Sequence, residues 1–204
     1  MLKKDYELIK TKYGHYASWA IWSEGNYETS KEIETIVCDI SMFEVGSNPE
    51  ILNLVKPEFV FVGLNISTAI VERKLSNFHG NVGAHHVTLR NVIKIRDAFE
   101  GTQYYGGYMT DVIKSFNESV SGKMMSHLKN NKSFEQENIK VFEAELADLG
   151  IENKIIFAFG GDVYKILSRN GLAQKYNIVK LPHYSHLISI NNYKQRVRGI
   201  LAGL

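Results

Sequence analysis

The chain has 204 residues, of which 44% are hydrophobic and 23% charged. This length and composition are typical of one soluble globular domain and exclude disordered, collagenous and coiled-coil chains. The net charge of +2 does not by itself indicate nucleic-acid binding. The single cysteine, Cys38, excludes an intramolecular disulfide framework and a four-cysteine zinc or iron–sulfur site, and it favours a reducing, cytoplasmic compartment.

The first 50 residues are expected to form an N-terminal extension of helix and loop. Residues 1–7 lack the apolar core of a signal peptide. The longest apolar run, 59–64, is far too short to span a bilayer, so no membrane partner is expected. The aromatic stretch 16–22 is predicted to pack over a sheet, and a base-stacking surface is the alternative for it.

The rest of the chain alternates short apolar runs with amphipathic segments of helical period. The predicted strands span 58–64, 108–113, 154–159 and 176–181, and the predicted helices span 87–99, 134–149, 162–172 and 190–201. Ser133 is predicted to cap the second of these helices, Gly150 to end it, and Asp162 to cap the third. Because strand and helix alternate, we expect one α/β domain over residues 1–204, with three layers, α/β/α, and a short central parallel sheet.

Ligands of such sheets bind at the carboxyl ends of the strands, and polar side chains lie within or directly after three of the predicted strands. Asn65 follows Gly63-Leu64 at the end of the first strand, and Thr110-Asp111 lies in the second. The last strand leads into His183-Tyr184-Ser185-His186-Leu187. The sequence therefore predicts one crevice lined from three strands. Gly160-Gly161-Asp162 lacks a full phosphate-binding glycine motif, so a plain turn is expected there.

Two of these segments resemble motifs of the uracil-DNA glycosylase superfamily. Gly63-Leu64-Asn65 is similar to its G-[QIL]-[DN]-P motif, and His183 to Leu187 is similar to its H-P-S-P-L-S motif with His, Ser and Leu in register. Residues 106–114 also resemble an uncharacterised branch of the superfamily. The resemblance covers roughly residues 55 to 204, and it implies a DNA base-excision fold for that part of the chain.

The resemblance also implies roles for individual residues. Asn65 would hold the attacking water, since an amide is not a useful general base, and His183 would donate a hydrogen bond to the departing base. Phe78, 13 residues after Asn65, stands where the family has an aromatic that stacks on the flipped base, with core packing as its alternative. Leu187 would be the wedge that fills the gap in the duplex, with a buried loop leucine as its alternative.

The remaining implied base contacts come from the same segments. Gly63, Leu64 and Ser185 are expected to line the substrate pocket, and the small Ser67 would leave room for a 5-substituted pyrimidine. The chain departs from the family motifs at Ile66, Tyr184, His186 and Asp111, where the family has three prolines and a base-reading asparagine.

Asp111 is the most informative of these departures. An ionised carboxylate only accepts hydrogen bonds, so it would repel the O4 carbonyl of uracil. Either the carboxyl is protonated in a dry pocket, or the preferred base presents adjacent N–H and NH2 groups. The alternative is that Asp111 pairs with a nearby lysine or caps a backbone turn.

DNA binding would need a positive rim, for which Lys180, Lys194 and Arg198 are the candidates, with a solvated helix face as the alternative. No metal or cofactor is expected, because His79, His85 and His86 lack the usual ligand number and spacing. We therefore expect a glycosylase-like hydrolase that acts, as a monomer, on a base flipped from duplex or single-stranded DNA. The alternatives are a non-catalytic nucleic-acid-binding module with a retained base pocket and an enzyme on free nucleotides.

Overall fold

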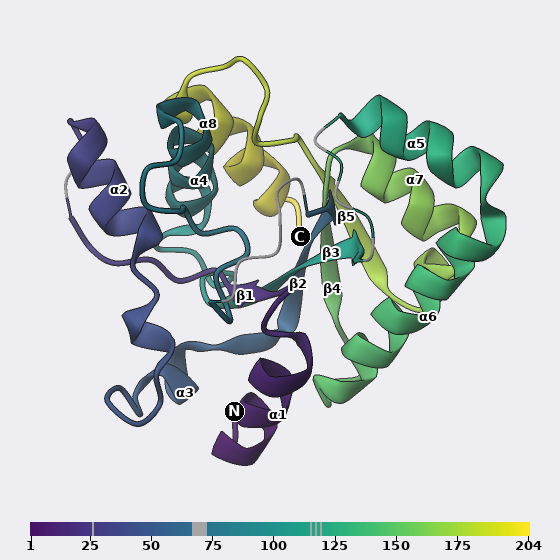
Figure 1. Ribbon diagram of the computed structural model, residues 1–204, viewed down its shortest axis with the longest axis horizontal. Helices are drawn as coiled ribbons and strands as arrows, with labels where there is room; N and C mark the ends of the chain where they lie inside the picture. Colours follow the sequence, from purple (N-terminus) through teal and green to yellow (C-terminus); the bar gives the residue numbers. More distant parts are fainter. Residues whose placement is uncertain (26, 67–72, 115, 117, 119) are drawn as a thin grey trace.

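The computed structural model describes residues 1–204 except 26, 67–72, 115, 117 and 119. The described strands form a five-stranded sheet in the order β1-β3-β2-β4-β5 (Figure 1). They are β1 (Ser18–Trp19), β2 (Lys56–Asn65), β3 (Gly107–Ile113), β4 (Ile155–Phe159) and β5 (Asn177–Leu181). The last four are parallel to one another, and β1 pairs antiparallel with the outer side of β3.

Helices cover both faces of this sheet (Figure 1). One layer holds α1 (Lys3–Tyr13), α5 (Ser121–Asn130), α6 (Lys132–Asp148) and α7 (Gly161–Arg169). The other holds α2 (Ser30–Cys38), α4 (His86–Phe99) and α8 (Ile190–Leu201). The short helices are η1 (Ser41–Phe43), α3 (Ile51–Leu54) and η2 (Leu172–Gln174). The predicted three-layer α/β/α architecture is confirmed.

Alternation along the strands divides the buried side chains between two cores. In β2, Val62 and Leu64 pack toward α1, α5, α6 and α7, whereas Phe61 packs toward α2, α4 and α8. In β4, Phe159 belongs to the same core as Phe61. By the same alternation, Gly63 of β2 and Asp111 of β3 face the layer formed by α2, α4 and α8.

Four local details differ from the sequence-based expectations. The two-residue strand β1 and helix α5 were not predicted, because the first is too short to show a period. Ser133 lies inside α6, whose N-cap residue is Asn131, and Asp162 lies in the first turn of α7, whose N-cap residue is Gly160, so neither caps its helix.

The predicted end of α6 at Gly150 is confirmed. Gly150 has a φ of 69°, and its N–H donates to the carbonyl of Ala147 at 2.9 Å.

The N-terminal extension is part of this fold. Trp19 of β1 is fully buried, and its ring lies between Tyr6 of α1, 6.1 Å away, and Tyr108 of β3, 5.0 Å away. The aromatic stretch around Trp19 thus packs against the sheet and is not an exposed base-stacking surface. In the described part of the chain, no helix combines the length and the apolar character needed to cross a membrane.

Candidate functional site

The sheet has a topological switch point beside β2. The chain passes from β2 to β3 on one side and then from β3 to β4 on the other. Open α/β sheets bind ligands at the carboxyl ends of the strands at such a point. Asn65 is the last residue of β2, and His183 follows β5 at the same edge of the sheet. The topology therefore brings these two predicted residues to one edge.

Gly63, Asp111 and Phe78 meet beside this edge. Gly63 is paired with Asp111 in the ladder between β2 and β3. A Cβ atom on Gly63 would lie 2.2 Å from Oδ1 of Asp111 and 2.9 Å from Cζ of Phe78. These separations are below van der Waals contact, so only glycine at position 63 leaves room for the carboxyl group and the ring together.

The Asp111 carboxyl group is buried and held on one side only. Its Oδ2 accepts a hydrogen bond of 2.9 Å from Nδ2 of Asn77, which also donates to the carbonyl of Tyr16 at 2.5 Å. Within the described residues, no donor reaches its Oδ1. Burial raises the pKa of Asp111 to about 6, against the opposing effects of the Asn77 hydrogen bond and the Lys114 charge.

The alternative that Asp111 pairs with a lysine is wrong. The nearby ammonium of Lys114 donates to the backbone carbonyl of Asp111 at 2.7 Å and forms its ion pair, at 2.6 Å, with Glu145 of α6. Lys114 and Glu145 belong to a buried polar cluster that also includes Thr110, on the opposite face of the sheet from the Asp111 side chain. The hydrogen-bond partner of the Asp111 carboxyl group is the side-chain amide of Asn77.

Phe78 begins a row of aromatic rings that ends at His183. Phe78 is half-buried and has a φ of 64°, a rare backbone conformation for a residue with a side chain, and its N–H donates to Oδ1 of Asn77 at 3.2 Å. Its ring lies 6.3 Å from that of Phe159, which lies 5.3 Å from Tyr184. Tyr184 stacks on His183 at 4.4 Å. Phe78, Asp111 and His183 thus lie in one connected neighbourhood.

The imidazole of His183 is held in one tautomer by Ser185. Its Nδ1 accepts a hydrogen bond of 3.2 Å from the backbone N–H of Ser185 and lies 2.8 Å from the hydroxyl. A neutral ring that accepts at Nδ1 carries its proton on Nε2. Burial and the nearby His186 lower the pKa of His183, opposed by Asp162, so the ring is neutral at pH 7. Nε2–H is then available as a donor.

The Asn65 amide is anchored by its nitrogen. Nδ2 donates to the carbonyls of Ile66, Phe116 and Glu118 at 3.1, 3.2 and 2.8 Å, which ties the end of β2 to the segment after β3. With the nitrogen committed to carbonyls, Oδ1 is the side-chain atom that can accept a hydrogen bond from water.

Leu64 and Ser67 were also predicted to line the pocket, and the structure does not show their side chains there. The Leu64 side chain is 9% exposed and packs into the core on the opposite face of the sheet, so only its backbone can line the site. Ser67 lies outside the described residues.

Leu187 and Lys180 lie on the surface, after and within β5 respectively, and Lys194 lies on α8. The Leu187 side chain is 100% exposed, so the alternative of a buried loop leucine is wrong. Lys180 is exposed, with Nζ 3.7 Å from the position of a Cβ on Gly161 at the start of α7. Lys194 is half-buried and, with Asn191, Gln195 and Arg198 of the same helix, lines a hollow of about 490 Å³.

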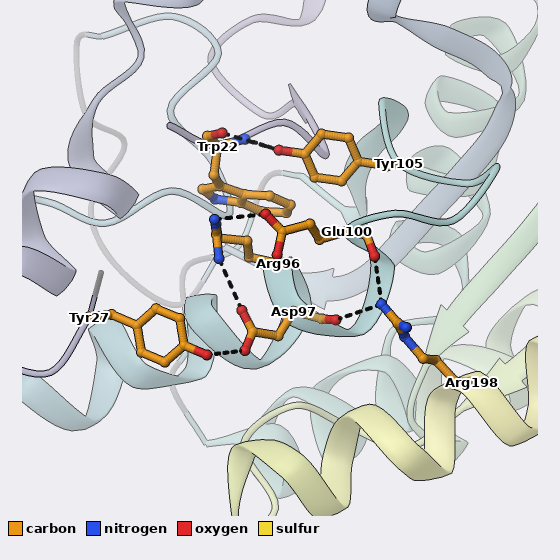
Figure 2. A network of polar contacts seen from close by, with 7 residues as sticks. All are labelled: Trp22, Tyr27, Arg96, Asp97, Glu100, Tyr105 and Arg198. Atoms are coloured by element: carbon orange, nitrogen blue, oxygen red, sulfur yellow. Dashed lines mark hydrogen bonds and ion pairs between the residues drawn. The ribbon is translucent and has the colours of Figure 1, made fainter. Parts of the chain in front are cut away.

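Arg198, the third basic residue predicted to contact DNA, binds backbone carbonyls at the end of α4. Figure 2 shows its guanidinium group turned toward the end of α4, where it donates to the backbone carbonyls of Asp97 and Glu100. Its Nε also donates to the carbonyl of Ala98 at 3.3 Å. A positive group at a helix C-terminus satisfies carbonyls that have no helical partner. Since α4 ends before β3 begins, this cap lies at the opposite edge of the sheet from Asn65. The hydrogen bonds of Arg198 to α4 could not be predicted from the sequence, because the partners are about 100 residues apart.

His79, His85 and His86, the histidines weighed as metal ligands from the sequence, do not form a metal site. His79 is 7% exposed and packs between the rings of Trp22 and Phe43, while Nδ1 of His85 accepts from the N–H of Val87 at the start of α4. Among the described residues, no three His, Cys, Asp or Glu side chains form a group that could hold a metal ion.

Sequence reasoning did not single out Asn77 or Lys94, two residues that hold parts of this site. Asn77 directly precedes Phe78, so its position beside a candidate residue was the one available signal. Lys94 gave none, because it lies within an ordinary amphipathic helix.

One comparison with known proteins identifies a family. The model of the "Uracil DNA glycosylase superfamily" matches residues 49–201, which is three quarters of the chain. The matched range contains both motifs, Phe78 and Asp111, and leaves out the first 48 residues. No curated protein and no solved structure matches the chain.

Proposed function

The chain belongs to the uracil DNA glycosylase superfamily, whose members act on DNA, and we propose that it is a glycosylase-like hydrolase that removes a flipped base. The observation that carries this proposal is the meeting of Asp111 and Phe78 above Gly63, connected by aromatic rings to His183. A carboxyl group, a stacking ring and an imidazole donor are the groups needed to read a base and to stabilise its departure.

The reaction breaks the bond between C1′ of the sugar and the base nitrogen, and the electron pair leaves with the base. His183 donates its Nε2–H to a base oxygen on which negative charge develops. Asn65 holds a water molecule through Oδ1, and the water oxygen forms the new bond to C1′ while its proton passes to solvent. Because an amide accepts no proton at neutral pH, Asn65 acts by positioning, and we expect turnover to be slow.

Entry of a base requires Phe78 to move. Asp111 is 3% exposed, and the Phe78 ring packs against the same glycine surface as its carboxyl group. When the ring swings away from Gly63, it uncovers Oδ1 and can stack on the incoming base. The half-buried position of Phe78 is compatible with this movement, since a fully packed ring would have to break a core.

Asp111 sets the base preference. With a pKa of about 6, the carboxyl group is ionised in roughly nine molecules of ten at pH 7. Its free Oδ1 and its Oδ2 both accept, which suits a base edge with adjacent N–H and NH2 groups and repels the O4 of uracil. Uracil is therefore not the preferred base of the wild-type protein.

The rim residues give the DNA contacts. Leu187 projects fully into solvent and fills the gap left by the flipped nucleotide, and Lys180 and Lys194 contact phosphates. Binding should then weaken steeply with salt, and Lys194→Glu should weaken it further.

The proposal is tested with a panel of duplex and single-stranded oligonucleotides, each with one modified base. Strand scission after alkali treatment reports excision, and Asn65→Ala is expected to lower its rate about tenfold or more without loss of binding. Equal rates for Asn65→Ala and wild type would remove this residue from the mechanism. Binding without scission would indicate a non-catalytic module, and activity on monomers alone would indicate a nucleotide enzyme. Either result would overturn the proposal.

The base preference has its own test on uracil-containing DNA. Asp111→Asn supplies both an acceptor and a donor, so it is expected to excise uracil about tenfold faster than wild type or better. No gain in either binding or excision of uracil would show that Asp111 does not read the base.

A further inference from the structure

Lys94 is a buried lysine in α4 that faces the loop carrying His183. Its side chain is 7% exposed. Nζ donates to the backbone carbonyls of Tyr184 at 3.1 Å and His186 at 2.8 Å, and to Oδ1 of Asn91 at 3.2 Å. All three ammonium protons are therefore directed at oxygens, two of which belong to one short loop.

The ammonium group has no carboxylate partner among the ion pairs of the described residues. Burial lowers the pKa of Lys94, and the charge of Arg90 lowers it further. Burying an unpaired charge opposes folding, and an apolar side chain of the same length would avoid this cost. Compared with such an apolar side chain, the ammonium group adds the hydrogen bonds to the loop carbonyls.

The two carbonyls that Lys94 binds stand on either side of Ser185, which holds the His183 ring. Among the described residues, the backbone bonds within this loop are short-range: the N–H of His186 donates to the His183 carbonyl at 3.1 Å, and that of Ile188 to the His186 carbonyl at 2.8 Å. Lys94 therefore adds hydrogen bonds from α4, across about 90 residues of sequence, to a loop whose other hydrogen bond to a helix, within the described part of the chain, is the one that the Tyr193 hydroxyl of α8 donates to the Pro182 carbonyl.

Tyr184 and His186 also occupy the positions that are proline in the H-P-S-P-L motif that this segment resembles. Proline stiffens a loop by fixing its own φ angle, and this chain has neither ring. The ammonium of Lys94 binds the carbonyls of the two residues that stand in their place.

We propose that Lys94 is a positioning residue, whose ammonium group fixes the loop that orients His183 and presents Leu187, in place of the two missing prolines. This inference rests on the proposed function for its catalytic consequence, but the ordering of the loop can be measured without any activity. Lys94 touches neither base nor sugar and acts through the backbone of Tyr184 and His186.

The test uses Lys94→Met, which keeps the length of the side chain and removes its donors. Lys154→Met is the matched control, because Lys154 is also a buried lysine, 4% exposed, but precedes β4 at the opposite edge of the sheet. Amide hydrogen exchange of His186 and Ile188 is expected to speed up about tenfold or more in Lys94→Met alone, with α4 unchanged. Unchanged protection of the two loop amides would overturn the proposal.

The second readout is the imidazole of His183 itself. Nitrogen NMR shifts should show one Nε2–H tautomer in wild type and in Lys154→Met, and a mixture in Lys94→Met. A single tautomer in all three proteins would overturn the positioning role even if the loop exchanges faster. If Lys94→Met does not fold, Lys94→Gln, whose shorter neutral amide cannot reach both carbonyls, takes its place in both measurements.

Excision then separates this inference from the proposed function. On a substrate found with the oligonucleotide panel, Lys94→Met should lower the single-turnover rate about tenfold with little change in DNA affinity, and Lys94→Arg, which keeps charged donors, should restore part of it. An unchanged rate would overturn the proposal. Absence of excision by wild type would overturn the proposed function, while the exchange and tautomer results would still decide the role of Lys94.

Discussion

Replacing Asp111 by asparagine should stabilise the protein at neutral pH. The pKa of this buried carboxyl is about 6 in the folded chain, against an ordinary value of 3.8. Folded protein then binds a proton more tightly than unfolded protein, so raising the pH from about 3.8 to about 6 removes stability. Two pKa units correspond to about 3 kcal/mol. Asp111→Asn has no carboxyl to ionise, and its amide oxygen can still accept from Asn77.

The expected signature is the pH dependence of the difference between the two proteins. Urea denaturation between pH 3.5 and 8 should give nearly equal unfolding free energies at the acid end. The advantage of Asp111→Asn should grow to about 3 kcal/mol above pH 6. A difference that stays constant with pH, or that is larger in acid, would refute the account of Asp111 as a buried, costly acid.

Asp148→Asn serves as a control of opposite sign. The Asp148 carboxylate accepts hydrogen bonds from Lys12 and Tyr13, which hold its pKa below the ordinary value. Its contribution to stability is present at neutral pH and is lost as the pH falls through the folded pKa. Asp148→Asn should therefore be less stable than wild type at pH 7, with a deficit that shrinks in acid.

Three further substitutions test separate parts of the structure. Gly63→Ala places a methyl group against the Asp111 carboxyl and the Phe78 ring, so its unfolding free energy should fall by about 1–3 kcal/mol, and an unchanged melting temperature would contradict the close approach. Leu187→Ala should leave stability within about 0.5 kcal/mol but weaken binding to duplex DNA, and equal affinity would exclude the wedge. Arg198→Met should lower the unfolding free energy by about 1–3 kcal/mol, because α4 loses the hydrogen bonds that cap its C-terminus. The salt dependence of DNA binding should stay the same, and a shallower dependence would show that Arg198 contacts phosphate.

The main sheet could be predicted because its signals are local. An apolar run of five to seven residues is enough to identify a buried strand, and the four predicted strands match β2, β3, β4 and β5 to within two residues at each end. Parallel strands share one carboxyl edge, so Asn65 and His183 were expected together before any coordinates. Their chemical roles stay predictions, because an edge in common does not show what binds there.

What the sequence determined by itself was the layer order and the edge on which polar groups gather, since both follow from periodicity and from the handedness of strand–helix connections. Only the tertiary structure decided which side chains hold one another. Asn77 reaches Asp111 across 34 residues, Lys94 reaches the His183 loop across about 90, and Arg198 reaches α4 across about 100. Such pairings depend on how whole elements pack, and no local pattern of residues records that packing.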